Sequence, residues 1–99
     1  MSSTNEILLF LKENKLFFKT KFHVLKIGIF GSYARNEQGE TSDIDIIVEF
    51  EENTENLYDK KYELREYLMA QFKTKIDLCR EGAIKPIFRN AILKDAIYV

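Results

Sequence analysis

The segment Lys26–Phe50, KIGIFGSYARNEQGETSDIDIIVEF, constrains the fold of this chain more than any other stretch. It contains two apolar runs, Ile27–Phe30 and Ile44–Val48, each typical of a buried β-strand. Gly31 and Ser32 follow the first run directly, and a glycine at a strand end lets the chain turn and lets a ligand approach the backbone. The segment therefore predicts two neighbouring strands joined by a turn and a polar loop.

Two aspartates, Asp43 and Asp45, stand at the start of the second run. Side chains two residues apart in a strand point to the same face, and their Cα atoms lie roughly 6.5–7 Å apart. Two carboxylates so placed repel each other, and partly buried acids are costly unless something neutralises them. A shared divalent cation relieves both costs, and carboxylate oxygens suit Mg²⁺ or Mn²⁺. The pair is therefore a candidate metal site.

The turn after the first strand supplies candidate phosphate-binding groups. If Ser32 opens a short helix through Arg35, its backbone N–H groups form an anion site and its hydroxyl adds a donor. Anion donors beside a metal-binding acidic pair are what a nucleoside triphosphate requires, because the metal bridges phosphate oxygens. Arg35 is a further candidate for charge compensation, although an arginine in this place is as often an ion-pair partner.

The residues Gly31-Ser32, Tyr33 and Ala34-Arg35, followed by SDIDIIVEF, resemble the signature of the DNA polymerase β-like nucleotidyltransferases in their smallest form. These minimal nucleotidyltransferases are often antitoxins paired with a HEPN-domain toxin. The resemblance covers nearly the whole chain. One departure is Asn36, where the family usually has glycine after Ala-Arg. Asparagine tolerates left-handed backbone geometry better than most residues, so we expect the turn to be retained.

Asp77 lies in the middle of an apolar run, Lys75–Cys79, that predicts a third strand. An aspartate there looks buried and asks for a partner. The residues alone leave two alternatives open: a third metal-binding carboxylate, or an ion pair with Arg35 or Arg80. The resemblance favours the first, because the family places its third metal-binding carboxylate on a strand in this position.

The resemblance implies a Mg²⁺-dependent transfer that uses two ions, with Mn²⁺ as a substitute and ATP as the nucleotide. Asp43 and Asp45 would hold the ion that bridges the triphosphate, and Asp77 would join Asp45 at the ion that activates the attacking hydroxyl. Gly31 and Ser32 would hold the β- and γ-phosphates, so that pyrophosphate leaves in line. The acceptor implied is a tyrosine hydroxyl on a HEPN toxin, which would receive AMP.

Size and charge limit the other functions. The 99 residues predict a single domain over residues 1–99, without room for the extra domains that grip a nucleic acid, and the net charge of −1 predicts no direct nucleic-acid binding. We therefore expect the acceptor on a partner protein. Two alternatives remain: a non-catalytic antitoxin or scaffold that neutralises its partner by binding, and a small-molecule nucleotidyltransferase, for which the chain is short. A homo- or hetero-oligomer is left open.

Composition and the chain start bear on location. Hydrophobic residues make up 45% of the chain and aromatic residues 13%, which indicates a folded globule. The single Cys79 excludes an intramolecular disulfide and is expected to be a buried strand residue. No apolar run approaches the ~18 residues of a membrane span, and Met1–Thr4 shows neither a basic region nor a secretory apolar run. These features predict a cytoplasmic protein without a membrane segment.

The remaining elements follow from periodicity and caps. Ser3 and Glu6 fit a capping box that opens a helix to about Glu13. The other expected elements are a short helix from Leu16 toward Lys21, a long helix over 57–72, a last helix from Pro86 or Ile87, and an edge strand over 96–99. This order predicts an α/β or α+β fold with a mixed sheet of three or four strands flanked by helices.

Two further polar features are weighed against ordinary roles. His23 could be a general base or a metal ligand, but without a Cys or His partner it is expected to be a loop or packing residue. The acids Glu51, Glu52 and Glu55 could form a second metal site, but an irregular acidic loop is expected to serve solubility.

Overall fold

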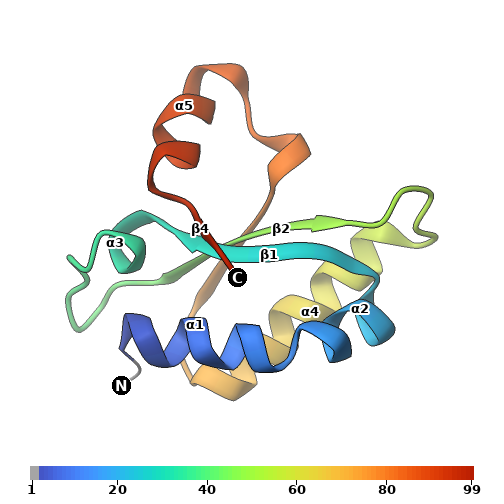
Figure 1. Ribbon diagram of the computed structural model, residues 1–99, viewed down its shortest axis with the longest axis horizontal. Helices are drawn as coiled ribbons and strands as arrows, with labels where there is room; N and C mark the ends of the chain where they lie inside the picture. Colours follow the sequence, from blue (N-terminus) through green and yellow to red (C-terminus); the bar gives the residue numbers. More distant parts are fainter. Residues whose placement is uncertain (1–2) are drawn as a thin grey trace.

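The computed structural model describes residues 3–99. Met1 and Ser2, on which part of the expectation about the chain start depends, lie outside the described residues. The elements in chain order are α1 (Thr4–Glu13), α2 (Lys15–Phe22), β1 (Val24–Phe30), α3 (Gly31–Ala34), β2 (Ile44–Phe50), α4 (Leu57–Phe72), β3 (Ile76–Arg80), a short 3₁₀ turn η1 (Glu81–Ala83), α5 (Pro86–Asp95) and β4 (Ile97–Tyr98) (Figure 1).

The helix starts follow the sequence signals. The Ser3 hydroxyl accepts from the backbone N–H of Glu6 at 3.1 Å, and the Ser3 N–H donates to the Glu6 carboxylate at 3.1 Å, which confirms the capping box. α2 ends at Phe22, and the residue that follows it, His23, adopts the left-handed conformation with a φ of 61°. α4 spans the predicted 57–72, because its apolar residues recur at helical period; Leu64 and Leu68 are buried.

The strands form one mixed sheet in the order β3-β2-β1-β4. β1 is antiparallel to both β2 and β4, whereas β2 and β3 are parallel, so that α4 forms the crossover between them. This confirms the predicted mixed sheet flanked by helices. The predicted first strand is too short, however: β1 begins at Val24 and carries an irregularity between Val24 and Lys26 that breaks the simple alternation.

The main core lies between one face of the sheet and the helices α1, α2 and α4, while α5 lies on the other side of the sheet (Figure 1). The residues of β2 alternate: Ile44, Ile46 and Val48 belong to the core, and the residues between them face the other way. The helices contribute Ile7, Leu11, Phe18, Phe22, Leu64 and Leu68 to the core. Since Asp45 alternates with core residues, it is directed to the α5 side of the sheet.

Polar contacts hold the chain on that second face. Glu49 accepts from the backbone N–H of Gly82 at 2.8 Å and pairs with Arg80 at 3.3 Å. Glu81 pairs with Lys26 at 3.0 Å and accepts a hydrogen bond from the Tyr98 hydroxyl. Together these contacts fasten η1 to β1, β2 and β4. None of the helices formed by residues 3–99 combines the length and hydrophobicity that crossing a bilayer requires.

Candidate active site

Gly31 sits where β1 ends, against the side chain of Asp45. Its φ is +70°, a left-handed conformation that L side chains rarely adopt. A Cβ atom added at this position would lie 2.1 Å from Oδ2 of Asp45. The positive φ therefore requires glycine here, and its missing side chain lets the Asp45 carboxylate approach the backbone.

Asp45 and Asp77 face each other across the parallel pair β2–β3, where they occupy matching register positions. Residues in register on neighbouring strands point to the same face, so both carboxylates open onto the α5 side of the sheet. Asp45 is half-buried and Asp77 is exposed, so the sequence-based expectation that Asp77 looks buried is wrong. It is exposed because it alternates with Ile76 and Leu78, which take the core positions of β3.

Electrostatics link the three predicted acids. Burial, together with the charge and hydrogen bonding of Asp77 and the charge of Asp43, raises the pKa of the Asp45 carboxyl to about 6. The Arg35 charge acts in the opposite direction on the same pKa. Burial and repulsion both destabilise the charged form of Asp45, so a cation bound at this carboxylate would stabilise it.

The donor set fits a hard divalent cation with an incomplete protein shell. Among residues 3–99, no group of three or more His, Cys, Asp or Glu side chains is arranged to hold a metal ion by itself. The register pair Asp45–Asp77 still presents two carboxylates on one face. Mg²⁺ commonly binds through one or two carboxylates, with waters and substrate phosphates completing its octahedron. The residues present therefore suit an ion that arrives with a nucleotide.

The two alternatives for Asp77 can now be compared. Arg35 pairs with Glu37 at 2.8 Å and with Asp95 at 2.9 Å, and Arg80 pairs with Glu49. Neither arginine makes an ion pair with Asp77 among the contacts of residues 3–99. The ion-pair explanation of Asp77 therefore has no support in the structure.

Helix α3, which carries the predicted phosphate-binding residues, is held in place by core packing and by hydrogen bonds to its backbone. Tyr33 is buried in the core, and its carbonyl accepts a hydrogen bond from the Thr4 hydroxyl at 2.7 Å. Ser32 is half-buried next to Gly31, and its carbonyl accepts from the N–H of Glu37 at 2.8 Å. Asn36 has a φ of 58°, so asparagine here adopts the left-handed conformation expected of it.

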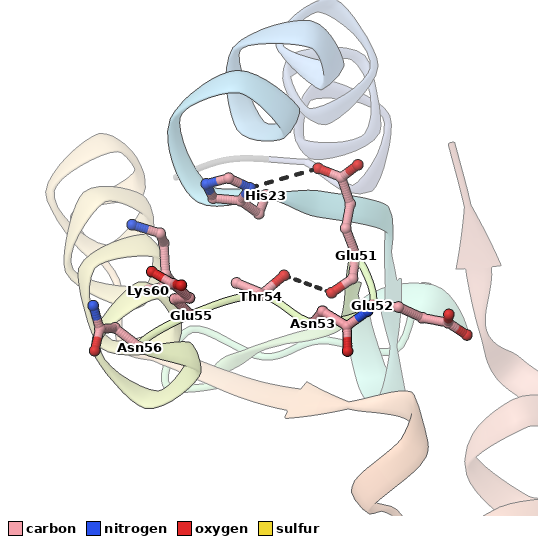
Figure 2. Close-up of a pocket in the computed structure, with 8 residues that line it drawn as sticks. All are labelled: His23, Glu51, Glu52, Asn53, Thr54, Glu55, Asn56 and Lys60. Atoms are coloured by element: carbon pink, nitrogen blue, oxygen red, sulfur yellow. Dashed lines mark hydrogen bonds and ion pairs between the residues drawn. The ribbon is translucent and has the colours of Figure 1, made fainter.

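A separate pocket of about 390 Å³ lies at the opposite end of the β1–β2 pair. It is lined by His23, Lys60 and the loop between β2 and α4, and Figure 2 shows His23 directed toward Glu51. The two side chains approach to 3.7 Å. His23 precedes β1 and Glu51 follows β2, whereas Gly31 and Asp45 lie at the other ends of these antiparallel strands. The pocket is thus remote from the predicted carboxylates, and His23 is in a loop as expected.

The structure adds residues that the sequence interpretation missed. Asp95 binds Arg35, Thr4 holds the carbonyl of Tyr33, and Glu49 fixes the backbone of Gly82. Each contact joins positions far apart in the chain, so no spacing in the sequence points to it. Cys79, expected to be buried, is only half-buried, because it alternates with Leu78 and faces the side of the sheet that carries Asp77.

The chain is similar in sequence to known proteins over most or all of its length. The sequence pattern of the nucleotidyltransferase domain matches residues 11–99. A Methanocaldococcus jannaschii protein, provisionally named a protein adenylyltransferase, is 48% identical over all of this chain and all of its own length. The protein adenylyltransferase MntA of Thermococcus cleftensis is 38% identical, over 100% of this chain and 98% of its own.

Solved structures give the same result for the fold. A structure described provisionally as a minimal nucleotidyltransferase matches with a TM-score of 0.77 at 28% identity, over 97% of this chain and 95% of its own. A toxin–antitoxin crystal structure with AMP-PNP matches with a TM-score of 0.67 at 23% identity, over 98% of this chain and 72% of its own. A structure of a tri-AMPylated Shewanella oneidensis HEPN toxin in complex with MNT antitoxin matches with a TM-score of 0.58 at 22% identity, over 89% of this chain and 68% of its own.

Proposed function

This chain belongs to the nucleotidyltransferase domain family, and from that premise we propose that it transfers AMP from ATP to a hydroxyl group of a partner protein. The observation that carries the proposal is the register pairing of Asp45 with Asp77 beside Gly31. A purely structural sheet gains nothing from two facing carboxylates, whereas a metal-assisted phosphoryl transfer requires them.

In this proposal Asp43, Asp45 and Asp77 hold Mg²⁺. When bound, the ions supply charge neutralisation for the triphosphate and a lowered pKa for the attacking hydroxyl. Asp45 carries a proton in part of the molecules near pH 6, and it gives up that proton to act as a ligand. Asp77 is the exposed member of the set, so the acceptor hydroxyl approaches from its side.

Gly31 and Ser32 take the phosphate groups. Without a side chain on Gly31, the backbone of α3 can come close to both Asp45 and a phosphate. The Ser32 hydroxyl can donate a hydrogen bond to a phosphate oxygen, and Arg35 adds positive charge at the same edge. The residues therefore orient the triphosphate, which is the main task of a protein in phosphoryl transfer.

The acceptor is proposed to be a HEPN-domain toxin, which makes this chain its antitoxin. Support comes from the relative of 38% identity that is named a protein adenylyltransferase and from the AMPylated HEPN toxin complex of similar fold. The alternative is a binding antitoxin that neutralises the partner by contact alone. The two differ in one product, the covalently bound AMP.

The test incubates the chain with ATP, Mg²⁺ and a HEPN-domain protein offered as the partner, and follows the mass of that protein. We expect an AMP-sized mass increase with the wild type, and none with the Asp43→Asn/Asp45→Asn double variant. Asp59→Asn is the matched control, because Asp59 is exposed on α4 outside the site. If the double variant neutralises the partner as well as the wild type does, without AMP on the partner, the binding alternative is correct.

The same proteins allow a direct binding measurement. Calorimetric titration of ATP should show Mg²⁺-dependent binding to the wild type and to Asp59→Asn, and loss of that binding in the double variant. Equal titration curves for the double variant and the wild type would remove the acidic pair from the nucleotide site.

A further inference from the structure

The Arg35 guanidinium is held between two carboxylates from different parts of the chain. Its Nε donates to Glu37 Oε1 at 2.8 Å, and its Nη1 donates to Asp95 Oδ2 at 2.9 Å. Glu37 belongs to the turn after α3, whereas Asp95 is the last residue of α5. A guanidinium has five N–H donors, so three remain for another ligand.

Arg35 stands directly next to the proposed phosphate-binding turn. Its backbone N–H donates to the carbonyl of Gly31 at 3.1 Å, which closes the single turn of α3. Gly31 in turn touches Asp45. The backbone of Arg35 is therefore fixed relative to the site, and the direction of its long side chain is set by Glu37 and Asp95.

Asp95 is also one of few attachments of α5. That helix has no fully buried residue. Among residues 3–99, its side chains make two polar contacts with the rest of the chain: Arg89 donates to the carbonyl of Glu81 at 3.0 Å, and Asp95 accepts from Arg35. The first contact lies toward the start of the helix and the second at its end, so Asp95 fastens the end of α5 to α3.

Resting on the proposed function, we propose that Asp95 is a positioning residue, which directs the Arg35 guanidinium toward the bound triphosphate and so couples the docking of α5 to nucleotide binding. Asp95 itself does not touch the nucleotide. An arginine that is already oriented loses less rotamer freedom when it binds phosphate, and an oriented charge improves affinity without a new contact.

The experiment measures Mg²⁺–ATP binding by calorimetry and AMP transfer kinetics for Asp95→Asn, Asp95→Ala and Asp95→Glu. We expect the dissociation constant and KM for ATP to rise about tenfold in Asp95→Asn, because a charge-assisted hydrogen bond is lost, while kcat changes little. Asp95→Glu should recover most of the affinity, since it restores the charge. The matched control is Asp59→Asn, an exposed acid on α4.

A double-mutant cycle isolates the pair. Arg35→Ala should weaken ATP binding at least as much as Asp95→Asn does, and adding Asp95→Asn to Arg35→Ala should cost nothing more. Additive losses would overturn the proposal, and so would a wild-type KM for ATP in Asp95→Asn. Thermal unfolding without nucleotide identifies a variant that merely fails to fold. In that case the ATP affinity of the Asp95→Glu variant decides whether the proposal holds. Failure of the wild type itself to bind ATP would instead contradict the proposed function.

Discussion

Asp45 on β2 and Asp77 on β3 lie opposite each other in a parallel strand pair, with both carboxylates on the sheet face that turns away from the main core. The apolar neighbours of each aspartate occupy the core positions, so neither strand can slip by one residue without burying a charge. The register that packs the core therefore also assembles the proposed metal site. The same strand register therefore determines both the packing of the core and the geometry of the proposed site.

Removing the Asp45 charge should stabilise the metal-free protein. Asp45→Asn abolishes both the burial penalty of the carboxylate and its repulsion with Asp77. We expect the thermal midpoint at pH 7 without metal to rise by about 3 °C, a shift that corresponds to well under 1 kcal/mol in a domain of this size. The same variant should no longer be stabilised by Mg²⁺ with ATP. A lower midpoint than the wild type in metal-free buffer would contradict this account of Asp45.

The stability of the metal-free protein should depend on pH in an unusual direction. The folded state keeps the Asp45 proton up to a pKa of about 6, whereas the unfolded chain releases it near the ordinary value of 3.8. The folded state thus binds more protons in this interval, so its stability falls as the pH rises from about 4 to about 6. Thermal unfolding should give a higher midpoint at pH 5 than at pH 7.

Glu49 provides the opposing trend at lower pH. Hydrogen bonds from the backbone N–H groups of Phe50 and Gly82, together with Arg80, lower the pKa of Glu49 despite its burial. Its contribution to stability is therefore present above its ordinary pKa and lost as the pH falls.

The Asp45→Asn variant is the control for the pH dependence predicted for Asp45, because the difference in thermal midpoint between pH 5 and pH 7 should largely vanish in it. A wild type that is more stable at pH 7 than at pH 5 would show that Asp45 does not retain its proton.

Gly31 and Gly39 form a matched pair for substitution. Gly31→Ala places a methyl group 2.1 Å from the Asp45 carboxylate at a positive φ, whereas the nearest atom to a Cβ at Gly39 is 3.9 Å away. We expect Gly31→Ala to lower the free energy of unfolding by about 2 kcal/mol and to abolish ATP binding, since a non-glycine residue is strained there. Gly39→Ala should change neither. Urea unfolding and calorimetry measure the two effects, and equal behaviour of the two variants would remove the special role of Gly31.

Asn36 tests whether the departure from the family pattern matters. Its φ of 58° is accessible to asparagine and freely accessible to glycine. Asn36→Gly should alter the free energy of unfolding by no more than about 0.5 kcal/mol, because relief of the left-handed conformation is offset by the greater freedom of the unfolded chain. Asn36→Val should cost about 2 kcal/mol, since a β-branched residue resists this conformation. A wild-type free energy of unfolding in Asn36→Val would show that the turn is free to rearrange.

Gly28 should control the attachment of β4. A Cβ at Gly28 would lie 2.2 Å from the carbonyl oxygen of Ile97, a backbone atom that can move only if the strand moves. Gly28→Ala should therefore detach β4 and destabilise the protein by about 2 kcal/mol. Hydrogen exchange would report the change as faster exchange of the Val99 N–H, which donates to the Ile27 carbonyl at 3.1 Å. Unchanged protection of that amide would contradict the prediction.

The sequence predicts the local elements well because their signals are local. The capping box of α1, the period of α4 and the proline at the start of α5 each lie within a few residues of the element that they define. The start of β1 is missed because Leu25 is exposed and the strand is irregular between Val24 and Lys26, so the apolar pattern begins only at Ile27. An apolar pattern in the sequence indicates a strand only where one face of that strand is consistently buried.

The candidate site is predictable in part for the same reason. Asp43 and Asp45 stand in one short motif, and their spacing predicts that they lie together. In the structure β2 begins at Ile44, so Asp43 precedes the strand that carries Asp45. Asp77 requires the family resemblance, because its nearness to Asp45 depends on how two distant strands pair. The Arg35–Asp95 contact lies beyond both kinds of reasoning, since an ion pair between an exposed arginine and a half-buried aspartate 60 residues away leaves no periodic trace in a sequence.

From the parallel pairing of β2 with β3 we expect an order of events in folding. β2 follows β1 along the chain as its antiparallel neighbour, whereas β3 can join only after the chain has crossed over through α4. Such long-range pairings close late, because their loop entropy is paid before the contacts form. A nascent or partly folded chain therefore presents Asp43 and Asp45 before Asp77 arrives. On the proposed mechanism, a chain in which β3 has not yet paired with β2 lacks Asp77 at the site and is therefore inert.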